Sequence, residues 1–161
     1  MIIIVMGVSG SGKTTIGQML ADALNWSFSD ADTFHSQANI EKMQRGIPLT
    51  DADRVAWLQA MQQAIAGWLQ EGKNKVLACS ALKATYREML WCNPDKMRLV
   101  YLKGSFELIE NRLAQRQHHF MSKDLLRSQF DTLEEPKDAI GVDISEAPAV
   151  IVKQIRDKLG V

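Results

Sequence analysis

The stretch of sequence that decides the fold is IIIVMGVSGSGKTT, residues 2–15. Its first five residues are apolar and mostly β-branched, which is typical of a strand buried on both faces. Gly7 ends this run, and helical periodicity begins at Thr14. We expect the helix over residues 14–24 to bury one face, made of Ile16, Met19, Leu20, Ala23 and Leu24.

The loop between this strand and helix, residues 7–14, matches the pattern G-x-x-x-x-G-K-[ST]. The glycines let the backbone curl until successive N–H groups point at phosphate oxygens, and the helix N-terminus adds positive partial charge. Lys13 is expected to reach the β- and γ-phosphates of a nucleotide, and Thr14 to offer its hydroxyl to Mg²⁺. The predicted phosphate-binding residues are Gly7, Ser9, Gly10, Ser11, Gly12, Lys13, Thr14 and Thr15.

Short apolar runs alternate with helical periodicity along the rest of the chain. Further strands are predicted at 26–29, 76–79, 98–103 and 140–144, and further helices at 54–70, 84–90, 106–115, 125–133 and 149–159. Apolar strands that alternate with helices indicate a parallel sheet covered on both faces. No repeat or linker interrupts the pattern. We therefore predict a single α/β domain over residues 1–161, with three α/β/α layers and a five-stranded parallel sheet.

The composition narrows the class of protein. Of the 161 residues 46% are hydrophobic, and 19 basic residues balance 19 acidic ones. A net charge of zero argues against a general nucleic-acid or membrane-surface binder, and no apolar run approaches the roughly 20 residues that span a bilayer. The N-terminus lacks the basic region of a signal peptide, and two cysteines are too few for a disulfide scaffold. We therefore expect a cytoplasmic protein with no nucleic-acid or membrane partner.

Two carboxylates, Asp30 and Asp32, follow the second predicted strand. The carboxyl ends of parallel strands open onto the ligand crevice, so we expect both acids near the terminal phosphate. The chain has no Asn-Lys-x-Asp guanine motif, and the strand at 76–79 does not end in aspartate. One acid could serve Mg²⁺ through water and the other a substrate hydroxyl, and the spacing leaves that division open.

Beyond Asp32, an ordered series of sequence blocks resembles the gluconokinase family. The blocks are DADTFH at 30–35, NIEKM at 39–43, GIPLTDADR at 46–54, WL at 57–58, CSALK at 79–83, YR at 86–87, YLKG at 101–104, QF at 129–130 and LEEP at 133–136. The resemblance runs from Ile3 to about Ile155. It implies a P-loop fold like that of nucleoside and shikimate kinases, ATP-dependent phosphorylation of D-gluconate at its 6-hydroxyl, Mg²⁺ and a homodimer. A shikimate-like kinase with another hydroxyl acceptor is the alternative.

The same resemblance implies roles for individual residues. Asp30 would serve the metal with Thr14, and Asp32 would meet the acceptor hydroxyl, although swapped roles stay open. We expect Arg54 to anchor the substrate carboxylate, because a planar guanidinium matches a carboxylate with two hydrogen bonds. Further substrate-binding candidates are His35, Ser80 and Lys83.

Residues 111–123 contain no carboxylate but hold Arg112, Arg116, His118, His119 and Lys123. Arg112 and Arg116 are four residues apart on one helical face, where like charges repel unless an anion lies between them. We interpret residues 112–127 as a short helical lid that closes over ATP and excludes water. Arg116 is expected to stabilise transition-state charge, which makes it the third predicted catalytic residue with Lys13 and Asp32. Arg112 is expected to contact phosphate or adenine, and the loop before Pro148 to flank the adenine.

Overall fold

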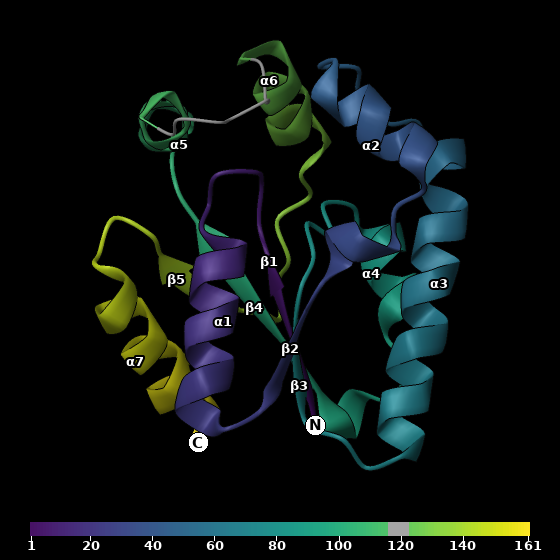
Figure 1. The fold of residues 1–161 in the computed structure, drawn as a ribbon. Coiled ribbons are helices and arrows are strands. Elements are labelled where there is room, and N and C mark those ends of the chain that lie inside the picture. Colours follow the sequence, from purple (N-terminus) through teal and green to yellow (C-terminus); the bar gives the residue numbers. More distant parts are fainter. Residues whose placement is uncertain (116–122) are drawn as a thin grey trace.

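The computed structural model describes residues 1–115 and 123–161 and has a parallel sheet at its centre (Figure 1). The five strands lie in the order β2-β3-β1-β4-β5. They are β1 (Ile2–Met6), β2 (Ser27–Asp30), β3 (Lys75–Ala78), β4 (Met97–Lys103) and β5 (Ile140–Asp143). Helices α1 (Lys13–Leu24) and α7 (Pro148–Leu159) cover one face, and α3 (Asp51–Gln70) and α4 (Ala84–Leu90) cover the other. The predicted three-layer fold is confirmed.

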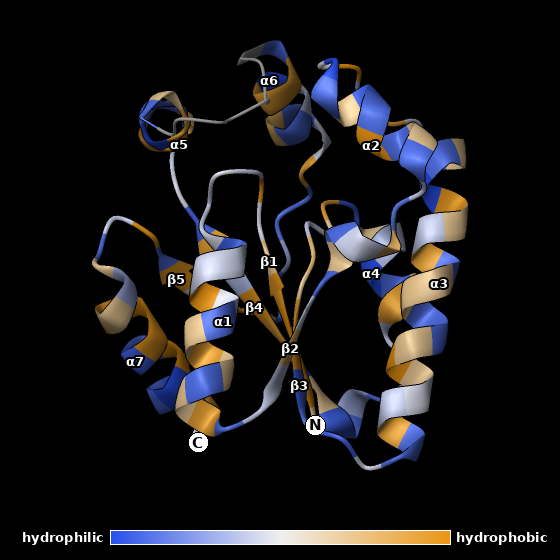
Figure 2. Cartoon of the chain, viewed as in Figure 1, coloured by the Kyte–Doolittle hydropathy of each residue, from blue (hydrophilic) through white to orange (hydrophobic). Residues whose placement is uncertain are grey.

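The central strand β1 supplies side chains to both hydrophobic cores. Ile3 and Val5 pack in the core beneath α1 and α7, whereas Ile2, Ile4 and Met6 pack in the core beneath α3 and α4. All five side chains are at most 2% exposed. Full burial of one such side chain contributes about 1.5–3 kcal/mol, so this short strand fixes both layers to the sheet. Figure 2 shows the hydrophobic residues gathered along the sheet and on the helix faces turned toward it.

Helix α3 begins one turn earlier than the sequence predicted. Thr50 and Asp53 form a capping box: Asp53 N donates to Thr50 Oγ1 at 3.2 Å, and Thr50 N donates to Asp53 Oδ2 at 3.0 Å. The helix can therefore start at Asp51, and the first turn carries two acids that suit the helix dipole. Arg54 then lies beyond the first turn, where a cation opposes the helix dipole less than it would at the first residue of the helix.

The segment between Asp32 and Thr50 is more regular than the sequence suggested. A short 3₁₀ helix, η1 (Ala31–Phe34), is followed by α2 (Gln37–Gln44), neither of which was predicted. Ser36 begins α2, because its hydroxyl accepts a hydrogen bond from Asn39 N at 3.2 Å. These two elements stand over the carboxyl end of β2 and form one wall of the site.

The buried face of α1 also differs from the prediction, at three positions. Ala23 is exposed, and Gly17 and Ala21 lie on the buried face with Ile16 and Leu20. Gly17 is needed because a Cβ there would lie 2.7 Å from the ring of Phe28.

Two further helices, α5 (Phe106–Ala114) and α6 (Lys123–Thr132), lie above the edge of the sheet where the strands end (Figure 1). The ends of the other predicted elements agree with the structure to within two residues. No helix within residues 1–115 and 123–161 is long and apolar enough to cross a membrane. Both cysteines are free, Cys79 buried and Cys92 exposed.

Candidate active site

The glycine-rich loop joins β1 to α1, as the sequence predicted. Gly12 adopts the left-handed conformation with φ 96° and precedes α1 without a side-chain cap, so the helix N-terminus is left for a ligand. Gly10 has φ 82°, and a Cβ there would lie 2.7 Å from Leu113 Cδ2 of α5. Both its backbone conformation and the close approach of α5 therefore require glycine at position 10.

One cavity at the carboxyl ends of the strands brings part of the phosphate loop together with most of the predicted acceptor residues. The predicted residues that line it are Ser9, Lys13, Asp30, Asp32, His35, Arg54 and Ser80. Other walls come from Met43 of α2, from the chain after α2, with Ile47, Pro48 and Leu49, and from α6, with Leu125, Ser128, Gln129 and Thr132. The phosphate loop and the predicted acceptor residues thus share a single space.

Thr14 and Asp30 form a pair of oxygen donors beside the phosphate loop. Thr14 Oγ1 donates to Asp30 Oδ2 at 2.8 Å, and Asp30 Oδ1 accepts from Asp32 N at 2.9 Å. Mg²⁺ prefers such hard oxygen ligands and keeps several waters and phosphate oxygens, so the two residues fit that ion. The described residues contain no cluster of three or more acidic, histidine or cysteine side chains that would bind a metal without those additional ligands. Lys13 Nζ donates to the carbonyl of Val8 at 3.0 Å, inside the loop.

The carboxyl group of Asp32 is electrostatically distinct from an ordinary surface aspartate. Loss of solvent inside the cavity raises its pKa, the neighbouring charge of Asp30 raises it further, and Lys13 partly offsets both effects. An aspartate with a raised pKa holds a proton more readily than a free one. The arrangement can therefore orient a hydroxyl and accept its proton.

Arg54 projects from α3 into the cavity. Its Nη1 donates to the carbonyl of Leu49 at 2.8 Å and to the hydroxyl of Tyr86 at 3.3 Å. Both hydrogen bonds to other described residues use the same nitrogen, so further N–H groups of the guanidinium can bind an anion. This geometry suits the predicted role as a carboxylate anchor.

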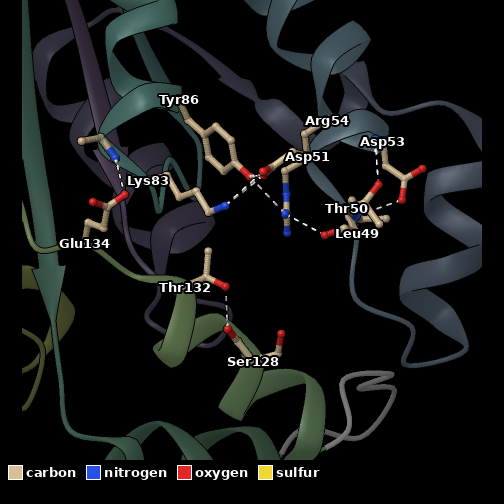
Figure 3. A network of polar contacts seen from close by, with 11 residues as sticks. Leu49, Thr50, Asp51, Asp53, Arg54, Lys83, Tyr86, Ser128, Thr132 and Glu134 are labelled. Carbon is tan, nitrogen blue, oxygen red and sulfur yellow. Dashed lines mark hydrogen bonds and ion pairs between the residues drawn. The ribbon is translucent and has the colours of Figure 1, made fainter.

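Lys83 does not line this cavity and lies in an ion pair instead (Figure 3). Its Nζ lies 3.0 Å from Asp51 Oδ1, and the hydroxyl of Tyr86 donates to the same carboxylate. The hydrogen bonds from Tyr86 and then from Lys83 lower the pKa of Asp51, and Asp51 in turn raises the pKa of Lys83. Asp51 and Tyr86 were not singled out from the sequence, although both lie in or beside the blocks that carried the resemblance.

His35 stacks on the indole of Trp57, with ring centroids 4.2 Å apart and an interplanar angle of 11°. Trp57 is itself fixed, because its Nε1 donates to the carbonyl of Ala31 at 2.8 Å. Burial, followed by the positive charge of Arg54, lowers the pKa of His35 to about 4. The imidazole is therefore neutral at physiological pH.

Gln129 of α6 is a site residue whose role the sequence did not indicate. Its Oε1 accepts from Ser9 N at 2.7 Å, and its Nε2 donates to Ser9 Oγ at 3.3 Å. The only signal was its place in the QF block at residues 129–130.

The predicted adenine-side residues lie away from this cavity. Arg112 Nη2 donates to the carbonyl of Ile144, just after β5, and Pro148 is exposed at the start of α7. A separate surface hollow lies between the ends of β4 and β5 and is lined by residues that include Gly104, Ser105 and Asp143. Arg116 lies outside the described residues, with the rest of the predicted lid from 116 to 122.

A glycine-rich loop that opens a helix, an acid pair and a guanidinium in one cavity of a parallel sheet define a small P-loop kinase. Residues 9–158 match the family model for shikimate kinase. A probable gluconokinase of Mus musculus is 45% identical over 152 residues, which cover 84% of this chain and 83% of the mouse protein.

Two solved structures have the same fold and substantial sequence identity. A gluconokinase from Sinorhizobium meliloti 1021 has a TM-score of 0.89 at 40% identity, covering 98% of this chain and 90% of that one. A sugar kinase from Janibacter sp. HTCC2649 has a TM-score of 0.92 at 41% identity, covering 99% and 94%. The chain belongs to the gluconokinase family, which confirms the resemblance and the prediction of a nucleotide-dependent kinase.

Proposed function

We propose that this kinase transfers the γ-phosphoryl group of ATP directly to the 6-hydroxyl of D-gluconate. The main support is the single cavity that joins Lys13 of the phosphate loop to Asp32 and Arg54. Gluconate carries one carboxylate and a chain of hydroxyls, so it needs a cation at one end and hydrogen-bonding groups along its length. The relatives of this kinase are gluconokinases, which favours gluconate over shikimate as the acceptor.

The nucleotide half of the proposal rests on residues 7–15 of the loop and on α1. Backbone N–H groups and Lys13 hold the phosphates, while Thr14 and Asp30 hold Mg²⁺. When bound, that ion supplies positive charge that neutralises the transferring phosphoryl group. Arg112 and Pro148 flank the base at the hollow beside β5, and Arg116 is retained as the residue proposed for transition-state charge.

The acceptor half is carried by groups on the opposite wall of the cavity. Asp32 orients the reacting hydroxyl and accepts its proton late in the transfer. Arg54 binds the carboxylate, and His35 and Ser80 bind hydroxyls. Lys83 is proposed as a further contact, and it must first exchange Asp51 for an oxygen of the substrate.

A coupled assay of ADP release tests the acceptor. The wild-type protein is given MgATP with D-gluconate, other sugar acids or shikimate, and Lys13→Ala serves as the blank. We expect turnover with D-gluconate, a 6-phosphate product by ³¹P NMR, and no turnover in the Lys13→Ala variant. Turnover with shikimate but not with D-gluconate would show that gluconate is not the acceptor. Only the assignment of the phosphate loop would then stand.

The family resemblance also leads us to propose a cytoplasmic homodimer. Light scattering in dilute buffer should then report twice the mass of the chain. The mass of a single chain would contradict the dimer, without consequence for the acceptor.

A further inference from the structure

Asn39 is a buried polar residue on α2, only 6% exposed, that none of the proposed steps uses. Its side-chain nitrogen Nδ2 lies 2.8 Å from the backbone carbonyl of Asp53 and 3.4 Å from Nδ1 of His35. The amide thus links α2 to the first turn of α3 and to a ring at the substrate cavity. A buried amide needs partners, and these two show what the side chain does there.

The contact with Asp53 fixes which way the amide points. A backbone carbonyl only accepts hydrogen bonds, so the atom of Asn39 beside it must be the nitrogen and not the oxygen. The amide has two hydrogens, and the second is then directed to His35 Nδ1. Because Nδ1 accepts this hydrogen bond, it carries no proton, and the ring proton must be on Nε2.

We propose that Asn39 is a positioning residue that holds His35 in the Nε2–H tautomer, so that His35 presents a hydrogen-bond donor to an oxygen of D-gluconate. This inference rests on the proposed function for its substrate. Stacking on Trp57 holds the plane of the ring, and Asn39 fixes its rotation and its proton. His35 lines the cavity, and its Nε2 makes no hydrogen bond to another residue in the described ranges.

The surroundings of His35 keep this tautomer neutral. Burial and the nearby Arg54 guanidinium both disfavour a second proton, and the pKa falls to about 4. A neutral ring with Nε2–H donates to a hydroxyl or carboxylate oxygen but accepts nothing at that position. The site therefore selects a substrate whose atom beside His35 accepts a hydrogen bond.

The tautomer can be read directly by ¹⁵N NMR on the wild-type protein at neutral pH, without any substrate. The chain has three histidines, so the spectrum of His35→Gln assigns the signals of His35 by difference. We expect Nε2 to resonate as a protonated nitrogen and Nδ1 as an unprotonated one. Protonation at Nδ1 would overturn the proposal, whatever the enzyme phosphorylates.

Kinetics of two substitutions test whether Nε2–H binds the substrate. His35→Gln places an amide close to the position of Nε2, whereas His35→Asn places it close to Nδ1. We expect His35→Asn to raise the KM for gluconate about 3- to 10-fold more than His35→Gln does, the value of one neutral hydrogen bond, with the KM for ATP unchanged. Equal effects of the two substitutions would overturn the role of the donor.

A double-mutant cycle separates positioning from a merely structural role. Asn39→Ala should raise the KM for gluconate about 3-fold and give mixed tautomer signals in the wild-type background. In the His35→Gln background, Asn39→Ala should not raise the KM for gluconate any further. The control Gln37→Ala, at an exposed position of the same helix, should leave that KM unchanged in both backgrounds. Independent effects of Asn39→Ala and His35→Gln would contradict the proposal. A wild-type protein that ignores gluconate would refute the substrate but leave the NMR result standing.

Discussion

Gln129 accepts a hydrogen bond from the backbone N–H of Ser9 at 2.7 Å, although the two residues are 120 positions apart in the chain. The same amide returns a hydrogen bond to Ser9 Oγ at 3.3 Å. Helix α6 therefore holds the phosphate loop at Ser9 from outside the loop. Because Ser9 lies in the cavity shared with Asp32 and Arg54, α6 connects nucleotide binding to the acceptor wall.

Gln129→Ala should raise the KM for ATP and lower kcat, each about 3- to 10-fold, because the loop loses two hydrogen bonds. Gln129→Glu should raise the KM for ATP further, since its negative charge would face the phosphates. Exposed Asp131→Ala on the same helix is the matched control and should leave both constants unchanged. Steady-state kinetics with ATP varied at saturating gluconate measures these effects. An unchanged KM for ATP in Gln129→Ala would show that the contact does not support the loop.

Arg54→Lys should raise the KM for gluconate at least about 10-fold with little change in the KM for ATP. Lysine keeps the charge but loses the planar pair of N–H groups and the fixed contacts of Nη1 with Leu49 and Tyr86. Arg45→Lys, at the exposed end of α2, makes the same chemical change outside the cavity and serves as the control. A similar rise of both KM values would show that the carboxylate anchor lies elsewhere.

The sequence predicted the elements whose signal is local. β1 is a continuous apolar run and the phosphate loop is a fixed motif, so both could be placed from residues 2–15 alone. The start of α3 was wrong by one turn, because the capping box uses Asp53 in place of the usual glutamate or glutamine. Helix α2 was missed because its polar sequence buries little more than Asn39.

The contacts that the sequence could not show join distant segments. Gln129 meets Ser9, and Lys83 meets Asp51, only after the chain has folded. Lys83 was expected to face the substrate because it follows β3 at the crevice. Its pairing with Asp51 depends on where α3 begins. Because the predicted start of α3 was one turn too late, Asp51 was not recognised as the partner of Lys83.

Asp51→Asn should lower the KM for gluconate by up to about 5-fold, the range of an exposed ion pair. The substitution removes the charge that competes with the substrate for Lys83, while the new amide can still bond to Tyr86. It should also lower the pKa of Lys83, which Asp51 now raises. The double variant Asp51→Asn with Lys83→Met should lose the gain. A higher KM for gluconate in Asp51→Asn would show that Asp51 supports the site and does not compete within it.

Asp32→Asn should lower kcat at least about 100-fold, because the hydroxyl loses its proton acceptor. The same substitution should stabilise the fold at neutral pH. The folded-state pKa of Asp32 is raised, so above that pKa the folded protein carries a carboxylate charge that the unfolded chain accommodates more easily. Stability therefore falls as pH rises through the window between the ordinary and the raised pKa, and an amide avoids that cost.

Thermal unfolding of Asp32→Asn and of the wild-type protein across acid and neutral pH measures this effect. The variant should melt higher at neutral pH, and the difference should vanish below the ordinary aspartate pKa, where Asp32 is protonated in both the folded and the unfolded wild-type protein. Asp138→Asn, in an exposed loop, is the matched control and should leave the melting temperature at neutral pH nearly unchanged. Lost activity without the neutral-pH gain in stability would mean that the carboxylate of Asp32 is stabilised in the folded protein, and that its proton affinity does not drive the transfer.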